Sequence, residues 1–182
     1  MRRKSARETL AESFRDIAKT KPVDRITIQD ILDDCGYSKT TFYRAYRDKY
    51  DLMAWDYIQR HGRVMEQMDA VEDGWKRTLM DGALLFAEQR DYLRNLLMHT
   101  SWLDSFSRHM KQIHYDHLSR CVLAAFGLEE LDVRTEMCLR SYCQGMTDLI
   151  CDWIMGVYDV CPEELAEVFD DCLPAPLRRY LP

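Results

Sequence analysis

The sequence predicts an all-α protein, and three observations support that prediction. Apolar residues recur at intervals of three and four along most of the chain, which is the spacing of a helix buried along one face. Seven glycines and five prolines among 182 residues leave few places for the many turns that short strands need. No segment shows the alternation of apolar and polar residues that is typical of strands, and there is no internal repeat.

The charge of the chain is distributed unevenly, and the asymmetry indicates a nucleic-acid partner at one end. The formal net charge is −6, which by itself argues against nucleic acid. Residues 1–50, however, hold 12 Lys and Arg against 8 Asp and Glu, whereas the remaining residues hold 13 against 23. A basic first third joined to an acidic remainder suggests that the N-terminal part meets phosphate and the rest does not.

Composition also argues against membrane, secreted and metal-bound classes. There is no run of about 18 apolar residues, so we expect no membrane span and no membrane partner. The N-terminus lacks the apolar core of a secretory signal, and we therefore expect a cytoplasmic protein. The seven cysteines are odd in number and form no Cys-x-x-Cys pair, which favours free thiols used as small hydrophobic residues.

The first expected helix spans residues 5–19. Ser5 and Glu8 have the spacing of a capping box, in which each side chain bonds the other residue's backbone N–H. The helix should end at Lys21-Pro22, because the residue before a proline avoids the helical region. Its apolar face provides one wall of a small core.

The stretch from Thr27 to Lys49 predicts a helix-turn-helix. The Thr27 hydroxyl can cap a short helix, and Gly36 can end it because glycine adopts the left-handed conformation at little cost. Ser38 can then cap a second helix rich in hydroxyl and basic side chains. Together with the first helix, these two predict a three-helix DNA-binding domain over residues 1–48.

A helix that reads DNA presents short polar side chains near its N-terminus, where it enters the major groove. Lys39 can donate to a guanine edge or a phosphate, and Tyr43 can reach the phosphate backbone. Lys49 opens the next helix, whose N-terminus also favours phosphate. The candidates for DNA contact are Thr27, Gln29, Ser38, Lys39, Thr40, Thr41, Tyr43 and Lys49.

Other residues of the same region set limits on this interpretation. Residues 2–4 form a basic arm suited to the minor groove, whereas Asp30, Asp33 and Asp34 should point away from DNA. Tyr46 is expected in the core. For each Lys and Thr the alternative is an ordinary solvated surface residue.

The run TIQDILDDCGYSKTTFYRAYRDKYDL resembles the DNA-binding signature of the TetR family of transcriptional regulators. The positions that carry the resemblance are Thr27, Cys35-Gly36, Ser38, Phe42-Tyr43, Tyr46 and Lys49. Cys35, Tyr37, Thr40 and Ala45 depart from the family's usual residues, and the last two bear on the operator sequence rather than on the fold. The ending WIMGVYDVCPEELAEVFDDCLP is similar to the branch with dihydroxyacetone kinase regulator-like members.

The remaining chain, residues 49–182, predicts a helical regulatory and dimerisation domain. Asp48 can cap its first helix, and Pro162 suits the first turn of its last. The expected helices span 49–68, 75–89, 90–99, 101–126, 131–158 and 162–173.

The family resemblance implies a homodimer built on the last two long helices. Residues 131–158 are apolar on more than one face, as a helix between its own body and a partner requires. Such surfaces are enriched in Met and aromatic residues. The interface candidates are Met146, Ile150, Trp153, Leu165 and Phe169; the alternative is that they form the core of one protomer.

The resemblance also implies a small-molecule effector bound in the body. Apolar and aromatic side chains that could line such a cavity are Phe86, Leu97, Trp102, Phe106, Met110, Tyr142 and Met146. The alternative is a solidly packed core.

The sequence thus favours a TetR-like regulator, in this family more often a repressor, that binds a palindromic operator as a homodimer under effector control. The alternative is a helical protein-interaction module that has lost DNA binding. An enzyme is not expected, because there is no Gly-rich phosphate loop and no paired acid and base, and no cofactor is implied. His114, His117 and Cys121 share a helix face, but without a fourth ligand we expect no metal site.

Overall fold

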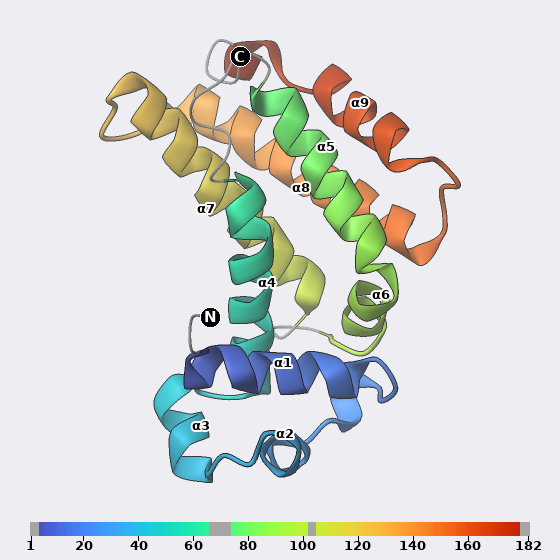
Figure 1. Ribbon diagram of the computed structural model, residues 1–182. Helices are drawn as coiled ribbons and strands as arrows, with labels where there is room; N and C mark the ends of the chain where they lie inside the picture. The colour runs from blue at the N-terminus through green and yellow to red at the C-terminus, as the bar shows by residue number, and fades with distance from the viewer. Residues whose placement is uncertain (1–3, 66–73, 102–104, 179–182) are drawn as a thin grey trace.

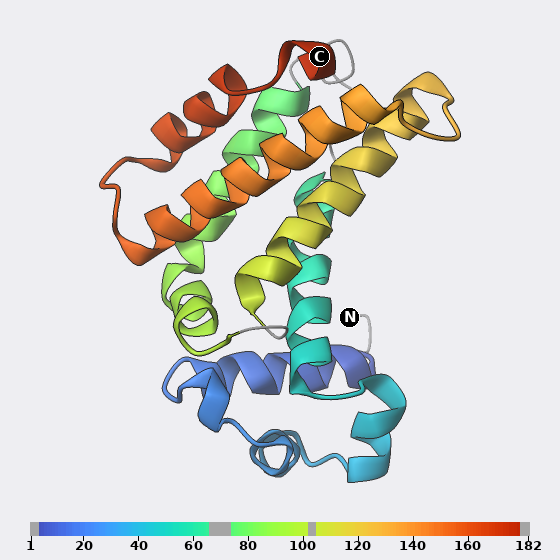
Figure 2. The ribbon, with the colours of Figure 1, turned by 180° about the vertical axis from the view of Figure 1, so that it is seen from behind.

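The computed structural model describes residues 4–65, 74–101 and 105–178, and Figure 1 shows its two parts. Ten α-helices and no strand are found in these residues, so the all-α prediction is confirmed. We call residues 4–48 the head and residues 49–178 the body. The head lies at one end of the molecule, and a single long helix, α4, enters the body from it (Figures 1 and 2). Arg2, Arg3 and Trp102, which carry predictions, lie outside the described residues.

The head consists of three short α-helices around a small apolar core. They are α1 (Ala6–Ala18), α2 (Ile28–Cys35) and α3 (Lys39–Ala45), with a 3-10 turn, η1 (Val23–Arg25), between the first two. The core side chains are fully or almost fully buried: Leu10, Phe14, Ile31, Leu32, Phe42 and Tyr46. Tyr46 is therefore in the core as predicted, and its hydroxyl donates to the Arg7 carbonyl at 3.0 Å.

Local capping explains why the head's helices begin and end where they do. Ser5 and Glu8 form the predicted capping box at the start of α1. Thr27 caps α2 by accepting from the Asp30 N–H, and Gly36 ends it with a φ of 72°. Ser38 caps α3 by accepting from the Thr41 N–H at 3.2 Å. These predictions are confirmed, and each cap satisfies backbone groups that a helix end leaves without a partner.

The body contains the remaining seven helices. They are α4 (Lys49–Met65), α5 (Gly74–Glu88), α6 (Arg90–Met98), α7 (Phe106–Phe126), α8 (Val133–Met155), α9 (Pro162–Asp171) and α10 (Ala175–Arg178). Two expectations are corrected: α7 begins at Phe106 rather than Ser101, and α8 ends before Gly156, whose φ is 87°. The short α10 was not predicted. Its Leu177 side chain is buried in the core of the body.

The body helices pack in two pairs, α5 with α9 and α7 with α8, and α4 packs against both α5 and α7. Two polar contacts from α8 join it to α9 and to the loop between them. The Tyr142 hydroxyl donates to the Phe169 carbonyl at 2.8 Å, and the Trp153 indole donates to the Val160 carbonyl at 2.9 Å. Within the described residues, no helix combines the length and the apolar character that crossing a bilayer requires.

Candidate functional site

Helix α3 presents its polar residues on the outside of the head. Phe42 is completely buried and holds one side of the helix in the core. Its ring packs beside that of Tyr46, with the ring centroids 5.9 Å apart. Lys39 and Thr40 are exposed, and Tyr43 is 57% exposed. A short helix held on one side and bare on the other is suited to insertion into a groove.

Arg44 belongs to this surface but was not among the predicted residues. It is exposed and follows Thr40 by four residues, so the two side chains share a face of α3. The helical spacing could have identified it. The exposed α3 surface therefore carries Ser38, Lys39, Thr40, Tyr43 and Arg44, with Thr41 half-buried beside them.

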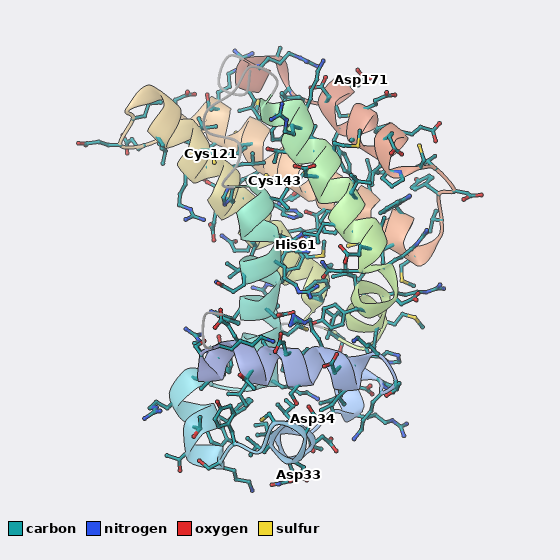
Figure 3. The ribbon with its side chains drawn as sticks, in the orientation of Figure 1. Asp33, Asp34, His61, Cys121, Cys143 and Asp171 are labelled. Atoms are coloured by element: carbon teal, nitrogen blue, oxygen red, sulfur yellow. The ribbon has the colours of Figure 1, made fainter. Side chains whose placement is uncertain are left out.

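Helix α2 carries two of the predicted DNA contacts, and both side chains have partners within the head. The Thr27 hydroxyl bonds the Asp30 carboxylate at 2.8 Å, and the Gln29 amide donates to Asp33 at 2.7 Å. Asp33 and Asp34 are exposed on the same helix (Figure 3). Acidic groups so close to Gln29 make α2 a poorer surface for phosphate than α3.

Asp30 proves to be neutralised inside the head rather than directed outward as a free charge. One carboxylate oxygen accepts from Lys21 Nζ at 2.7 Å and from the Thr27 N–H at 2.7 Å. These bonds, the one from Lys21 first, hold the pKa of Asp30 well below its usual value. Asp30 thus completes the cap of α2 and fixes the α1–α2 loop.

Lys49 was predicted to meet phosphate, but the structure gives its ammonium another task. Its Nζ donates to the carbonyls of Val23, Asp24 and Ile26 at 2.8–2.9 Å. Burial lowers the pKa of Lys49, and the charge of Asp24 opposes that shift. Since the ammonium is already occupied by three acceptors, Lys49 is better described as the residue that fixes the η1 loop to α4.

The N-terminus of α4 is likewise occupied. The Asp48 carboxylate accepts from the N–H groups of Tyr50 and Asp51 at 2.9 and 2.8 Å, which confirms the predicted cap. The carboxylate therefore takes the position at which a phosphate oxygen would meet these N–H groups.

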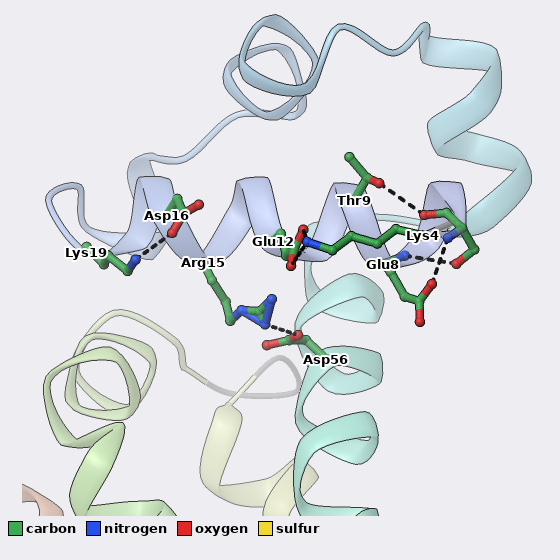
Figure 4. A network of polar contacts seen from close by, with 9 residues as sticks. Lys4, Glu8, Thr9, Glu12, Arg15, Asp16, Lys19 and Asp56 are labelled. Atoms are coloured by element: carbon green, nitrogen blue, oxygen red, sulfur yellow. Dashed lines mark hydrogen bonds and ion pairs between the residues drawn. The ribbon is translucent and has the colours of Figure 1, made fainter. Parts of the chain in front are cut away.

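Two body residues, Asp56 and Asn95, make polar contacts to the head that the sequence did not reveal. Asp56 on α4 accepts from Arg15 on α1 at 3.0 Å (Figure 4). It also accepts from the Tyr92 hydroxyl on α6 at 3.2 Å. Asn95 on α6 donates to the carbonyls of Ala18 and Lys21 and accepts from the Val23 N–H. Helix α6 is thereby bonded directly to the loop that precedes α2.

A cavity of about 410 Å³ lies inside the body between α4, α5, α7 and α8. Its volume is in the range of small-molecule sites. Two of the predicted lining residues, Phe86 and Met146, do line it. The sequence reasoning missed His61 and Trp75, which contribute polar groups from α4 and α5.

The other predicted cavity residues lie elsewhere. Phe106 and Met110 are completely buried in packed core, and Tyr142 is buried with its hydroxyl bonded to Phe169. None of them, nor Leu97, is part of the cavity wall. Their helical spacing correctly indicated burial but could not distinguish solid core from cavity.

A chain of buried hydrogen bonds runs from α4 to α8 through His114, which is part of the cavity wall. Thr147 donates to the Cys143 carbonyl at 2.7 Å, so its oxygen accepts from His114 Nδ1–H at 2.8 Å. His114 Nε2 then accepts from the Tyr57 hydroxyl at 2.8 Å. Both His114 nitrogens are engaged in these bonds, so His114 is a structural residue. Burial lowers its pKa to about 4, which keeps it neutral.

The five predicted interface residues are not on the surface of the protomer. Met146, Ile150, Trp153, Leu165 and Phe169 are between 1% and 8% exposed in the single chain. Their apolar side chains pack α8 and α9 onto the rest of the body, and Met146, Ile150 and Phe169 also line the cavity. We therefore correct this prediction in favour of its alternative, the core of one protomer.

The apolar residues of α8 and α9 that do reach the surface are different ones. Val133 and Met137 on α8 are 73% and 67% exposed, and Val168 on α9 is 43% exposed. Ser141 and Gly145 continue the line of Val133 and Met137 at intervals of four residues and are also exposed. Figure 2 shows α8 crossing the body between α9 and α7.

Comparison with solved structures places this arrangement in a known fold. The chain superposes on "Dihydroxyacetone kinase operon activator DhaS" with a TM-score of 0.64 at 14% identity, covering 97% of this chain and 98% of that one. It superposes on a TetR transcriptional regulator from Rhodococcus sp. RHA1 with a TM-score of 0.65 at 16% identity, covering 96% and 98%. It superposes on a TetR transcriptional regulator from Streptococcus agalactiae 2603V with a TM-score of 0.64 at 14% identity, covering 92% of this chain and 93% of that one.

These matches define the class: the chain has the fold of TetR-type transcriptional regulators along nearly its whole length. The resemblance noted in the helix-turn-helix is thereby confirmed at the level of the fold. The likeness extends to a dihydroxyacetone kinase operon regulator, the branch that the chain's ending resembles. No protein-family model and no curated protein matches the sequence.

Proposed function

We propose that this protein is a TetR-like transcriptional regulator that contacts double-stranded DNA through α3. The observation that carries the proposal is the exposed row of Lys39, Thr40, Tyr43 and Arg44 on a helix held by buried Phe42. Hydroxyl and cationic groups on one such face can bond both base edges and phosphates. Lys49 and Asp30 support this surface by fixing the loop and the cap behind it.

A homodimer would bring two α3 helices to one palindromic operator. The exposed apolar residues Val133, Met137 and Val168 support a partner surface on α8 and α9. Ser141 and Gly145 would let a second α8 approach closely because their side chains are small. Such a dimer should read half-sites about 34 Å apart, one turn of the double helix.

Control by a small-molecule effector is supported by the position of the cavity. Its α4 wall belongs to the same helix that carries Asp56 and enters the head. Its α5 wall leads into α6, whose Asn95 is bonded to the head. A ligand that shifts α4 or α5 would thus change the position of α3. We propose a division into a DNA-binding domain, residues 1–48, and a regulatory domain, residues 49–182.

Whether the protein activates or represses transcription depends on the gene that it regulates and is not determined by the fold. Repression is the expectation from the family resemblance, whereas one matched structure is named an operon activator. We propose a regulator of transcription, not an enzyme, that acts in the cytoplasm.

Selection on random duplex DNA, followed by gel retardation with the recovered site, tests the function. The change of Lys39→Ala should weaken binding about tenfold, since one cation at a base or phosphate is worth about 1–3 kcal/mol. Affinity of the wild-type protein should fall steeply with salt because bound phosphates release counterions.

Lys76→Ala is the matched control, because Lys76 is exposed on α5 and its loss changes the net charge equally. It should leave retardation unchanged. If selection recovers no site, or if both variants bind like the wild type, DNA contact through α3 is refuted. The interaction-module alternative would then be favoured.

A further inference from the structure

Two buried polar atoms on the wall of the cavity have no hydrogen-bond partner among the described residues. They are Nε1 of Trp75 on α5 and Nε2 of His61 on α4. The two residues are only 3% and 5% exposed. A buried donor without an acceptor costs about 1–3 kcal/mol, and an indole N–H can only donate. Both residues line the same cavity, so a molecule inside it could supply the missing partners.

The rings that carry these atoms are held in place. His61 lies between Tyr57, with ring centroids 4.0 Å apart, and Phe86, at 4.6 Å and an interplanar angle of 24°. Trp75 lies beside Tyr142, with ring centroids 6.2 Å apart. Because the rings are packed, their polar atoms are fixed features of the site, and the aromatic walls favour a flat apolar molecule.

Among the described residues, the inner part of the cavity offers no charge to balance an ionic ligand. Of the described lining residues, Asp116 and Arg120 carry a formal charge, and both side chains are exposed to solvent. The Arg120 guanidinium is already bonded to the Asp116 carbonyl and to His117. An ion pair with it at a solvent-exposed position adds about 0–1 kcal/mol, less than burial of an ion costs.

We propose that the cavity binds an uncharged, mainly apolar molecule whose hydrogen-bond acceptor pairs with Trp75 Nε1–H, with a second polar group at His61 Nε2. The proposal rests on the proposed function only in naming that molecule an effector. Binding itself is measured without DNA, so the two claims can fail separately.

Four probes that share a naphthalene ring test the proposal by isothermal titration calorimetry at pH 7.5. They are 2-acetylnaphthalene, the isosteric hydrocarbon 2-isopropenylnaphthalene, 2-naphthoate and 2-naphthylmethylammonium. The ketone should bind about tenfold more tightly than the hydrocarbon, because it supplies the acceptor that the indole lacks. Both ions should bind more weakly than the ketone, since burial removes their hydration.

Trp75→Phe keeps an aromatic ring but removes the N–H, so it should abolish the preference for the ketone over the hydrocarbon. Trp55→Phe is the matched control, because Trp55 lies on α4 outside this cavity and should leave the preference intact. Equal or tighter binding of either ion overturns the proposal. So does an undiminished ketone preference in Trp75→Phe, or a folded wild-type protein that binds none of the four probes.

Discussion

The head and the body present similar apolar patterns in sequence, but they use them differently. In the head, all three helices begin at the predicted caps, α2 ends at the predicted glycine, and the exposed candidates on α3 are indeed on the surface. In the body, all helices except the short α10 were also anticipated, but the five interface candidates are buried and most of the cavity candidates are packed core. The difference shows that helix ends can be predicted from nearby residues in the sequence, whereas the packing partners of a buried side chain cannot.

The physical reason is the separation in sequence between the residues that determine each feature. A cap such as Ser38 acts on an N–H three residues away. By contrast, whether Met146 faces the cavity, the core or a partner depends on α4, α5 and α7, which come from distant segments. Helical periodicity identifies the buried face of α8 but not the element that covers it.

The first test asks whether the head's small core is a cooperative unit of its own. Phe42→Ala removes a completely buried ring and should lower the free energy of unfolding by about 4 kcal/mol. Urea unfolding followed by circular dichroism measures the loss. In so small a core, we expect the head to melt in a separate early transition.

Two controls make this test specific. Phe106→Ala removes an equally buried ring from the body and should shift the main transition instead. Tyr43→Ala changes an exposed ring and should have a much smaller effect than Phe42→Ala. A single shared transition in both buried variants would show that head and body unfold as one unit, and would contradict a separate transition of the head.

The second test addresses the joint between the two regions. Arg15→Met leaves the Asp56 carboxylate, whose side chain is 4% exposed, without its cation. Burial already raises the pKa of Asp56, and the charge of Arg15 opposes that shift. Removing one partner of a buried pair should cost about 3 kcal/mol in the free energy of unfolding, measured by urea titration.

Lys19→Met is the comparison, because the Lys19–Asp16 pair is formed at 2.6 Å by side chains that are 68% and 63% exposed. Such exposed pairs contribute about 0–1 kcal/mol. If the two variants lose the same stability, the Arg15–Asp56 contact is not a specific joint.

The third test separates the regions by pH. Burial lowers the pKa of His114 to about 4, so the unfolded chain takes up this proton first, near pH 6.5. The stability of the body should be constant above pH 6.5 and fall between pH 6.5 and 4, by up to about 1.4 kcal/mol per pH unit for this histidine. Burial also holds the pKa of His61 well below its ordinary value, which adds to the same trend.

The head should respond at lower pH. The bonds from Lys21 and Thr27 lower the pKa of Asp30, so its contribution is present above the ordinary pKa of 3.8 and is lost only as pH falls below it. Unfolding in urea at pH 7, 6 and 5 measures the slope, and His114→Asn should reduce it. A slope unchanged by this substitution would contradict the assignment to His114.

Predictions from the sequence were best where one residue's chemistry suffices. Gly36 and Ser38 define the turn of the helix-turn-helix because φ and hydroxyl geometry are local properties. Lys49 was placed correctly at the start of α4, but its three carbonyl partners lie 23 to 26 residues earlier in the chain. The charge pattern suggested phosphate, whereas the fold uses the ammonium as a clamp.

The sequence by itself determined the all-α class, the helix-turn-helix and, apart from Arg44, the polar row on α3, because each follows from periodicity, capping and composition. The tertiary structure alone decided the joints made by Asp56 and Asn95, the cavity with His61 and Trp75, and which face of α8 remains open. These features depend on how helices from distant segments pack together. The chemical character of a single side chain does not specify which distant residue it will contact.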